Sequence, residues 1–299
     1  MSMTEMIPAF YVLAVLSALS FILNGTFLIV ICKNWTLVKR RRITYHLTSL
    51  AISDCLFGAS GFCANITAVV ARNATTLKSV LTSISVIGFL TSLLAVCLMA
   101  IERALCIKKP LTWNEIFTLR RIIRIMVGNW VLALTLAILL YFYTLEIKIT
   151  IFILCHIPIF VTSLVYISIY LKISKPNEVD GEAQHSFSTG ERLNKLMKRK
   201  FGNLVLILSL VLVITMMPSL LCSAVQFTCE LSVNCKFIET ANTIATYTYL
   251  LATIHFVVNP ILYAWRIRLY QQAFWKVLGM QGWQRELTIH TLFQIRPVV

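Results

Sequence analysis

Charged residues are scarce in this chain, and acidic ones are the scarcest. Of its 299 residues, 13% are charged, with 12 Asp or Glu against 27 Lys or Arg. A soluble domain has about 25% charged and about 45–50% apolar residues, whereas 58% of this chain is hydrophobic. One aqueous core cannot bury so much apolar surface. The composition therefore excludes an ordinary soluble domain and indicates that lipid solvates part of the chain.

Polar stretches long enough for a separate soluble domain are also lacking. A helix needs about 20 apolar residues to cross the hydrocarbon layer, and backbone groups in lipid favour helices over open strands. We therefore predict an all-α membrane protein, a seven-transmembrane helix bundle over residues 1–265. Its spans are expected at about 8–32, 44–71, 78–106, 122–144, 147–172, 202–227 and 238–263.

Basic residues are nearly missing from alternate connections between these spans. Only Arg72, Lys78, Lys148 and Lys236 fall on the side opposite the C-terminal tail. This asymmetry predicts an extracellular N-terminus and a basic cytoplasmic face. The net charge of +15 then borders lipid and meets anionic headgroups, so nucleic acid is not an expected partner. Residues 266–299 are predicted to form a short cytoplasmic amphipathic helix, with alternating basic and aromatic residues, and a tail.

Two features mark the predicted extracellular loops. Cys229 and Cys235 share the loop between spans six and seven, where the compartment is oxidising, so we predict a disulfide. Asn73 begins an Asn-Ala-Thr sequon in another such loop and is a predicted glycosylation site. The sequons at Asn24 and Asn34 lie in lipid or cytoplasm and are expected to be inert.

One acidic residue stands inside a predicted span. Asp54 in span two should face the bundle interior, because a carboxylate in lipid costs about 2.5–3.5 kcal/mol. Ser92 in span three and Asn259 in span seven are candidate oxygen partners, and such oxygens suit a sodium ion. A neutral, hydrogen-bonded Asp54 is the alternative.

The residue patterns of enzymes and transporters are missing. Neither HExxH nor GxSxG occurs, and His46 and His156 have no partners at ligand spacing, so both are expected to be interfacial histidines or histidines with satisfied hydrogen bonds. A transporter would show paired intramembrane charges or repeats, and neither is visible. We therefore expect no enzymatic activity and do not favour transport.

Seven landmarks occur in the order and at the spacing of a known family. The chain resembles a rhodopsin-like (class A) G-protein-coupled receptor over nearly its whole length. The landmarks are Asn24, the Leu50–Asp54 LAxxD motif, Glu102-Arg103-Ala104, Trp130, Pro158 with Tyr166, Pro218, and the NPxxY motif Asn259–Tyr263 with Pro260.

The resemblance implies a plasma-membrane receptor that binds an extracellular ligand and activates a heterotrimeric G protein. Arg103, beside Glu102, would contact the G protein, while Tyr166 and Tyr263 approach each other, and Pro110 and Leu111 would form the loop that docks into it. Asp54, Ser92 and Asn259 match the sodium pocket of the family. The implied ligand-pocket residues are Ser85, Phe89, Thr150, Ser219, Ser223, Tyr249 and Thr253.

These pocket residues exclude some classes of ligand but do not select one. Ser85 stands where amine receptors have Asp, and Thr253 stands where opsins have the retinal-binding Lys. A small molecule, a lipid and a peptide all remain open, and ordinary helix packing is the alternative at each position.

The departures from the family are informative. Lys78 replaces the span-three cysteine, Met216 the tryptophan before Pro218, and Ala104 the aromatic of the span-three motif. The missing bridge, the short second extracellular loop and the Cys229/Cys235 pair partly resemble the melanocortin branch, which groups with adenosine and cannabinoid receptors. Because the relay through Met216 is altered, a non-signalling or decoy receptor is the alternative.

Overall fold

Long apolar helices dominate the fold, as the composition predicts. The computed structural model describes residues 3–39, 42–71, 73–108, 110–142, 157–165, 167–169, 207, 210–226, 228–229, 235, 237–266 and 268–277, and every regular element among them is helical. Five helices are long and apolar enough to cross a membrane. They are α1 (Met3–Lys33), α3 (Arg42–Val70), α4 (Thr75–Lys108), α6 (Leu119–Phe142) and α10 (Ile238–Arg266).

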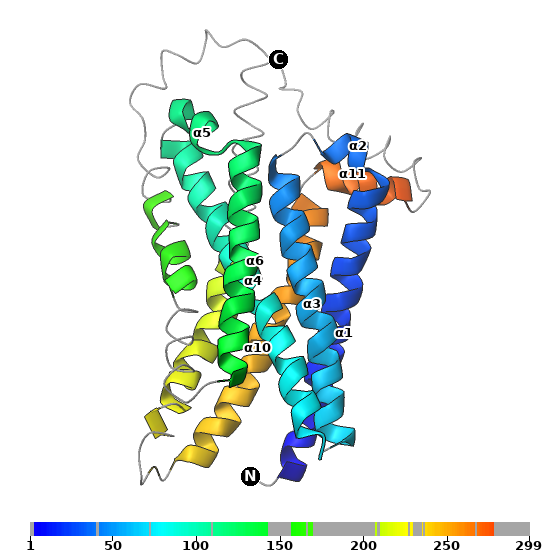
Figure 1. The fold of residues 1–299 in the computed structure, drawn as a ribbon, viewed down its shortest axis with the longest axis vertical. Coiled ribbons are helices and arrows are strands. Elements are labelled where there is room, and N and C mark those ends of the chain that lie inside the picture. Colours follow the sequence, from blue (N-terminus) through cyan, green and yellow to red (C-terminus); the bar gives the residue numbers. More distant parts are fainter. Residues whose placement is uncertain are drawn as a thin grey trace, which may run out of the picture.

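Two shorter apolar helices, Ile157–Ile169 and Leu210–Gln226, lie within the predicted spans five and six. In Figure 1 the seven segments run side by side along the long axis of the molecule. The all-α membrane fold is therefore confirmed. The other residues of the ranges predicted for spans five and six lie outside the described residues.

The helix ends differ from the predicted ones. α1 begins at Met3 and α4 at Thr75, so that Lys78 lies inside the first turn of its helix rather than at the first position of the span. Helices can continue beyond the apolar layer into the headgroup region, so polarity alone does not mark where they end. Pro110, expected to turn the chain, instead begins the short helix α5 (Pro110–Ile116), because proline is well suited to the first helical position.

Two glycines allow the backbones of neighbouring helices to approach. α3 packs between α1 and α4, while α4 also contacts α6, and α10 contacts α1. A Cβ at Gly58 would lie 2.7 Å from Ser17 O of α1, and one at Gly88 would lie 2.6 Å from Ser53 O of α3. Small residues at such contacts permit close packing, which is the main source of helix association in lipid.

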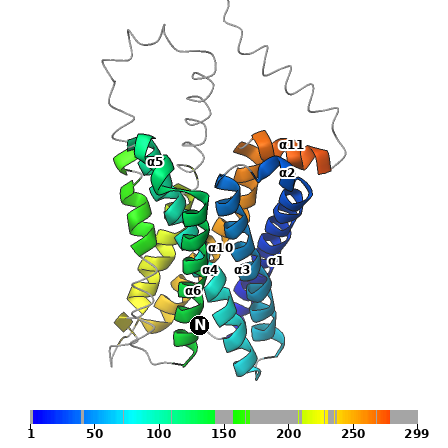
Figure 2. The same ribbon diagram turned by 45° about the horizontal axis from the view of Figure 1, so that its top comes forward.

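A short helix after α10 lies across one end of the bundle. α11 (Arg268–Val277) sits beside α2 (Trp35–Val38), at the end opposite the N-terminus (Figures 1 and 2). Tyr270 and Ala273 are buried on its inner face, and Tyr270 Oη donates to Thr44 Oγ1 of α3 at 2.9 Å. This confirms the amphipathic helix expected after the last span. We refer to this end as the α11 end.

Candidate functional site

The centre of the bundle holds a buried polar cluster around Asp54. Asp54 is 0% exposed, and Asn259 of α10 donates from Nδ2 to its Oδ2 at 2.8 Å. The same amide nitrogen lies 3.4 Å from His255 Nε2, one turn earlier on α10. The structure thus brings together Asp54 and Asn259 from the predicted set and adds His255.

Several oxygens of this cluster have no hydrogen-bond partner among the described residues. They are Asp54 Oδ1, Ser92 Oγ and Asn259 Oδ1, and Ser92 adjoins the Asp54 carboxyl. Buried polar atoms are otherwise almost always paired. Carboxylate, hydroxyl and amide oxygens are ligands that a small hard cation prefers, so the chemistry of these three side chains suits a sodium ion.

α1 fixes the position of this cluster. Ser20 Oγ donates to the backbone carbonyl of Asp54 at 3.2 Å, and Asn24 Nδ2 donates to the carbonyl of Phe256 at 2.9 Å. These bonds join α1 to α3 and α10 at the depth of Asp54. Asn24, the landmark of span one, is fully buried and therefore has a structural role.

Three phenylalanines pack next to the Asp54 cluster, on its side away from the α11 end. The rings of Phe57 and Phe256 stack with centroids 4.0 Å apart, and Phe89 lies 6.0 Å from Phe256. Met216, at the position of the family's tryptophan, and Leu212 are buried in the same core cluster. Phe89, a predicted ligand residue, therefore packs on core aromatics.

The other predicted ligand residues are placed unevenly. Ser85 is 6% exposed and lies with its Oγ 2.9 Å from Ser60 Oγ across the α3–α4 contact. Thr253 is buried and donates to the carbonyl of Tyr249. Tyr249 itself is 37% exposed. Ser219 is buried, Ser223 is half-buried, and Thr150 lies outside the described residues.

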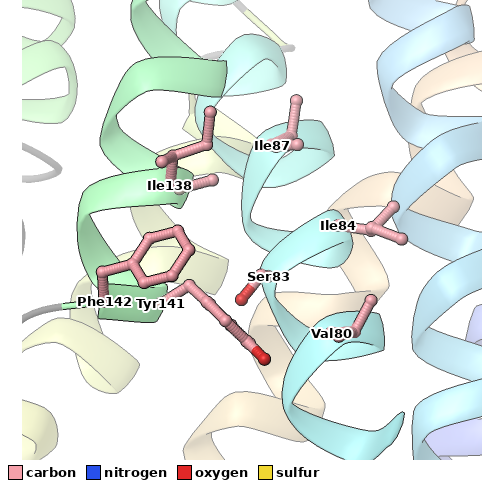
Figure 3. A pocket seen from close by; sticks show the side chains of 8 residues that line it. Val80, Ser83, Ile84, Ile87, Ile138, Tyr141 and Phe142 are labelled. Carbon is pink, nitrogen blue, oxygen red and sulfur yellow. The ribbon is translucent and has the colours of Figure 1, made fainter. Parts of the chain in front are cut away.

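An apolar groove of about 220 Å³ lies between α4 and α6 (Figure 3). Side chains of both helices line it, and the hydroxyls of Ser83 and Tyr141 are its polar groups. The groove contains none of the predicted ligand residues. Its apolar wall includes Val80, Ile84, Ile87, Ala137, Ile138 and Phe142.

At the α11 end, Glu102 is buried against a histidine. Glu102 and His46 are each 1% exposed, and Glu102 Oε2 lies 2.9 Å from His46 Nε2. His46 is therefore a buried histidine with a carboxylate partner, in line with the expectation of a satisfied histidine. The identity of the partner was not predicted, because the contact joins α3 to α4 across 56 positions of sequence.

The remaining coupling residues are described in part. Tyr263 is fully buried, and its ring lies 5.3 Å from that of Phe27. Pro260 is inside α10, and Arg103 lies in α4, which continues to Lys108. The side chains of Arg103, Pro110 and Leu111, and the whole of Tyr166, lie outside the described residues.

The two predicted loop features have different outcomes. Cys229 and Cys235 form a disulfide with Cα atoms 5.2 Å apart, so that prediction is confirmed. Asn73 is exposed between α3 and α4, and its glycosylation stays a prediction.

Sequence reasoning missed His46, His255 and Phe256 as site residues. His255 precedes the predicted ligand Asn259 by four positions, which places both on one helix face. That spacing is a signal that could have identified it. The contact of His46 with Glu102 carries no such local signal.

These elements define the class of the protein, a helical membrane bundle with a buried acidic centre. Residues 23–150 match the family described as 7 transmembrane receptor (rhodopsin family). This match covers less than half of the 299-residue chain, and proteins of this family are receptors rather than enzymes. A comparison with curated proteins gave no significant match. The match is to the family as a whole, so the melanocortin-like branch stays a prediction.

Proposed function

We propose that the chain is a plasma-membrane receptor that binds an extracellular ligand at the N-terminal end of the bundle and activates a heterotrimeric G protein at the α11 end. The observation that carries this proposal is the Asp54–Asn259 bond of 2.8 Å, within a chain that matches the rhodopsin family. It joins the LAxxD and NPxxY segments between the two ends. A movement of α10 relative to α3 at this depth would change this buried contact.

The basic residues support this orientation. Most of the Lys and Arg fall in alternate connections between the spans and in the tail that begins with α11. Connections rich in basic residues face the cytoplasm. A basic rim suits both anionic lipid and the acidic surface of a protein partner. The disulfide Cys229–Cys235 then falls at the extracellular end, where it is chemically stable.

Sodium is the ion we propose for the Asp54 cluster. Asp54, Ser92 and Asn259 would hold it, and bound sodium would stabilise the arrangement in which α3 and α10 are joined. The test is thermal unfolding of the purified chain in sodium chloride and in N-methyl-D-glucamine chloride. We expect a higher Tm in sodium for the wild type and no difference for Asp54→Ala; equal wild-type values would contradict the site.

Receptor activity is tested by basal G-protein activation in cells that express the chain. Arg103→Ala is the matched loss-of-coupling variant, and its surface expression must equal that of the wild type. We expect wild-type activation above that of Arg103→Ala for at least one G-protein subtype. If both are equally silent with every G protein tested, the coupling proposal fails.

A non-signalling receptor is the second candidate, and one observation favours it. Met216 is 1% exposed and Leu212 is 0% exposed, so smaller side chains fill the core where the family's relay aromatics would be. The two candidates differ in the activation experiment. Only for a signalling receptor should G-protein activation by the wild type exceed that by Arg103→Ala.

A further inference from the structure

The short helix α5, which connects α4 to α6 at the α11 end (Figures 1 and 2), is too short to be stable by itself. It has seven residues, and isolated helices shorter than about 12–15 residues are only marginally formed in water. α5 therefore depends on contacts with other elements. Two such contacts are made by arginines, one from α3 and one from α6.

The first contact joins the middle of α5 to α3. Arg42, the first residue of α3, has its guanidinium carbon 4.9 Å from the centroid of the Trp113 ring. A guanidinium within about 6 Å of an indole centroid is attracted by the negative face of the ring. Both side chains are half-buried, so this contact holds α5 against the end of α3.

The second contact joins the end of α5 to α6. Arg121, in the first turn of α6, donates from Nη1 to the carbonyl of Glu115 at 2.9 Å and to that of Ile116 at 3.3 Å. These are the last two carbonyls of α5. The last carbonyls of a helix lack donors within the helix and form its negative end. Arg121 therefore supplies both a donor and a positive charge where α5 ends.

The turn between α5 and α6 keeps Arg121 in this position. Phe117 is 5% exposed, and its N–H donates to the carbonyl of Trp113 at 2.9 Å. Thr118 Oγ1 accepts from the N–H of Arg121 at 3.4 Å, which is the hydrogen bond of a helix N-cap. The buried ring and the cap together fix the start of α6 relative to α5.

We propose that Arg42 and Arg121 keep α5 folded as a helix before a G protein binds, and thereby determine how readily this chain couples. α5 carries Pro110 and Leu111, which are expected to dock into the G protein. A segment that is already ordered does not have to lose conformational freedom on binding. Both arginines act through α5 and are positioning residues. Their role in coupling rests on the proposed receptor function, whereas their effect on α5 rests on the contacts alone.

Hydrogen exchange of α5 tests this effect without a G protein. It is measured on the full chain in lipid nanodiscs, with the Phe117 amide reporting on the last turn of α5. We expect exchange to be about two- to fivefold faster in Arg121→Gln, the effect of losing one cation at a helix C-terminus. Arg121→Lys keeps a cation there and should exchange more slowly than Arg121→Gln.

Arg124→Gln is the matched control for this measurement. Arg124 lies one turn after Arg121 on α6 and is also exposed, but the hydrogen bonds to the α5 carbonyls come from Arg121. Its removal should leave exchange of α5 at the wild-type rate. Unchanged exchange in Arg121→Gln, or an equal increase in Arg124→Gln, would overturn the proposal.

A double-mutant cycle isolates the contact between Arg42 and Trp113. Exchange of the Phe117 amide is compared in the wild type, Arg42→Gln, Trp113→Leu and the double variant. We expect the increase in the double variant to be about two- to fivefold smaller than the product of the two single increases, the effect of one cation–π contact. An increase equal to that product would show that the two side chains do not stabilise α5 together, and Arg42 would have no part in the mechanism.

The coupling test measures nucleotide exchange by the full chain in nanodiscs at increasing concentrations of a purified G protein. Because only molecules with a folded α5 are competent to bind, a smaller folded fraction raises the half-saturating concentration of G protein. We expect increases of up to about fivefold for Arg42→Gln and Arg121→Gln relative to Arg124→Gln, with the same rate at saturation. Arg124→Gln removes the same charge from the basic rim, so it corrects for the general loss of electrostatic attraction.

The two measurements separate failure of this inference from failure of the receptor function. Equal nucleotide exchange by the wild type and Arg103→Ala would refute receptor function and the coupling role together, while hydrogen exchange would still decide whether the arginines hold α5. If the wild type exceeds Arg103→Ala but Arg42→Gln, Arg121→Gln and Arg124→Gln share one half-saturating concentration, receptor function stands and this inference is overturned.

Discussion

Asn24 of α1 donates a hydrogen bond from Nδ2 to the backbone carbonyl oxygen of Phe256 in α10, at 2.9 Å. In an unbroken helix this carbonyl would accept from the N–H four residues later, but that residue is Pro260, which has no N–H. Asn24 therefore satisfies an acceptor that the proline leaves open. The span-one asparagine and the NPxxY proline are thus two parts of one contact.

Asn24→Ala should destabilise the bundle, because it leaves the Phe256 carbonyl unpaired in a buried site. The expected loss is about 1–3 kcal/mol, the cost of a buried unsatisfied acceptor, seen as a lower Tm. Pro260→Ala restores an N–H to α10 and is the matched second change. Combined with Pro260→Ala, Asn24→Ala should cost less than it does alone; an equal cost in both backgrounds would contradict this account.

Gly88→Ala should separate α3 from α4. Its Cβ would lie 2.6 Å from Phe57 N and from Ser53 O, both backbone atoms that cannot rotate away. Overpacking of this kind costs about 1–3 kcal/mol. Gly128→Ala on α6 is the control, because a Cβ there meets nothing within 4 Å. The Tm should fall for Gly88→Ala and stay the same or rise for Gly128→Ala, and the reverse order would be inconsistent with the observed packing.

Tyr270→Phe should loosen α11 from the bundle. It removes the 2.9 Å hydrogen bond to Thr44 Oγ1, which contributes about 0.5–1.5 kcal/mol. The ring still packs on Phe27, so the helix should remain formed. Hydrogen exchange of α11 measures the change, and faster exchange confined to α11 and the start of α3 is the expected result.

The same tyrosine makes stability depend on alkaline pH. Burial raises the pKa of Tyr270 to about 12, whereas an unfolded tyrosine ionises at about 10. The unfolded state therefore loses this proton first, and stability falls as the pH rises from about 10 to about 12. The Tm of Tyr270→Phe should decline less steeply in this range, and parallel curves would show that Tyr270 does not contribute.

The Cys229–Cys235 disulfide predicts a specific labelling pattern. Intact-mass analysis after alkylation of the denatured, unreduced chain should leave both sulfurs unlabelled, and labelling after reduction should add two groups. Cys229→Ser is the control, since it should free Cys235 for labelling without reduction. Two additional labels on the unreduced wild type would exclude the bond.

The sequence predicts the membrane-spanning helices well, because a helix in lipid needs a long apolar run and such runs are visible in the amino-acid composition. The contact between Asp54 and Asn259 was also predictable, because polar side chains within membrane spans need hydrogen-bond partners from other spans. The His46–Glu102 contact and the Phe57–Phe256 stack were not. Each depends on how two helices rotate and approach, and at α3 that approach is fixed by Gly58 and Gly88.

The most direct test of receptor function is nucleotide exchange on purified heterotrimeric G proteins by the chain in lipid nanodiscs at a fixed neutral pH. Arg103→Ala, matched in folding by its Tm, provides the baseline. The account predicts faster exchange with the wild type than with Arg103→Ala for at least one G protein. Equal rates for the folded wild type and Arg103→Ala across all G-protein classes, with and without candidate ligands, would contradict it.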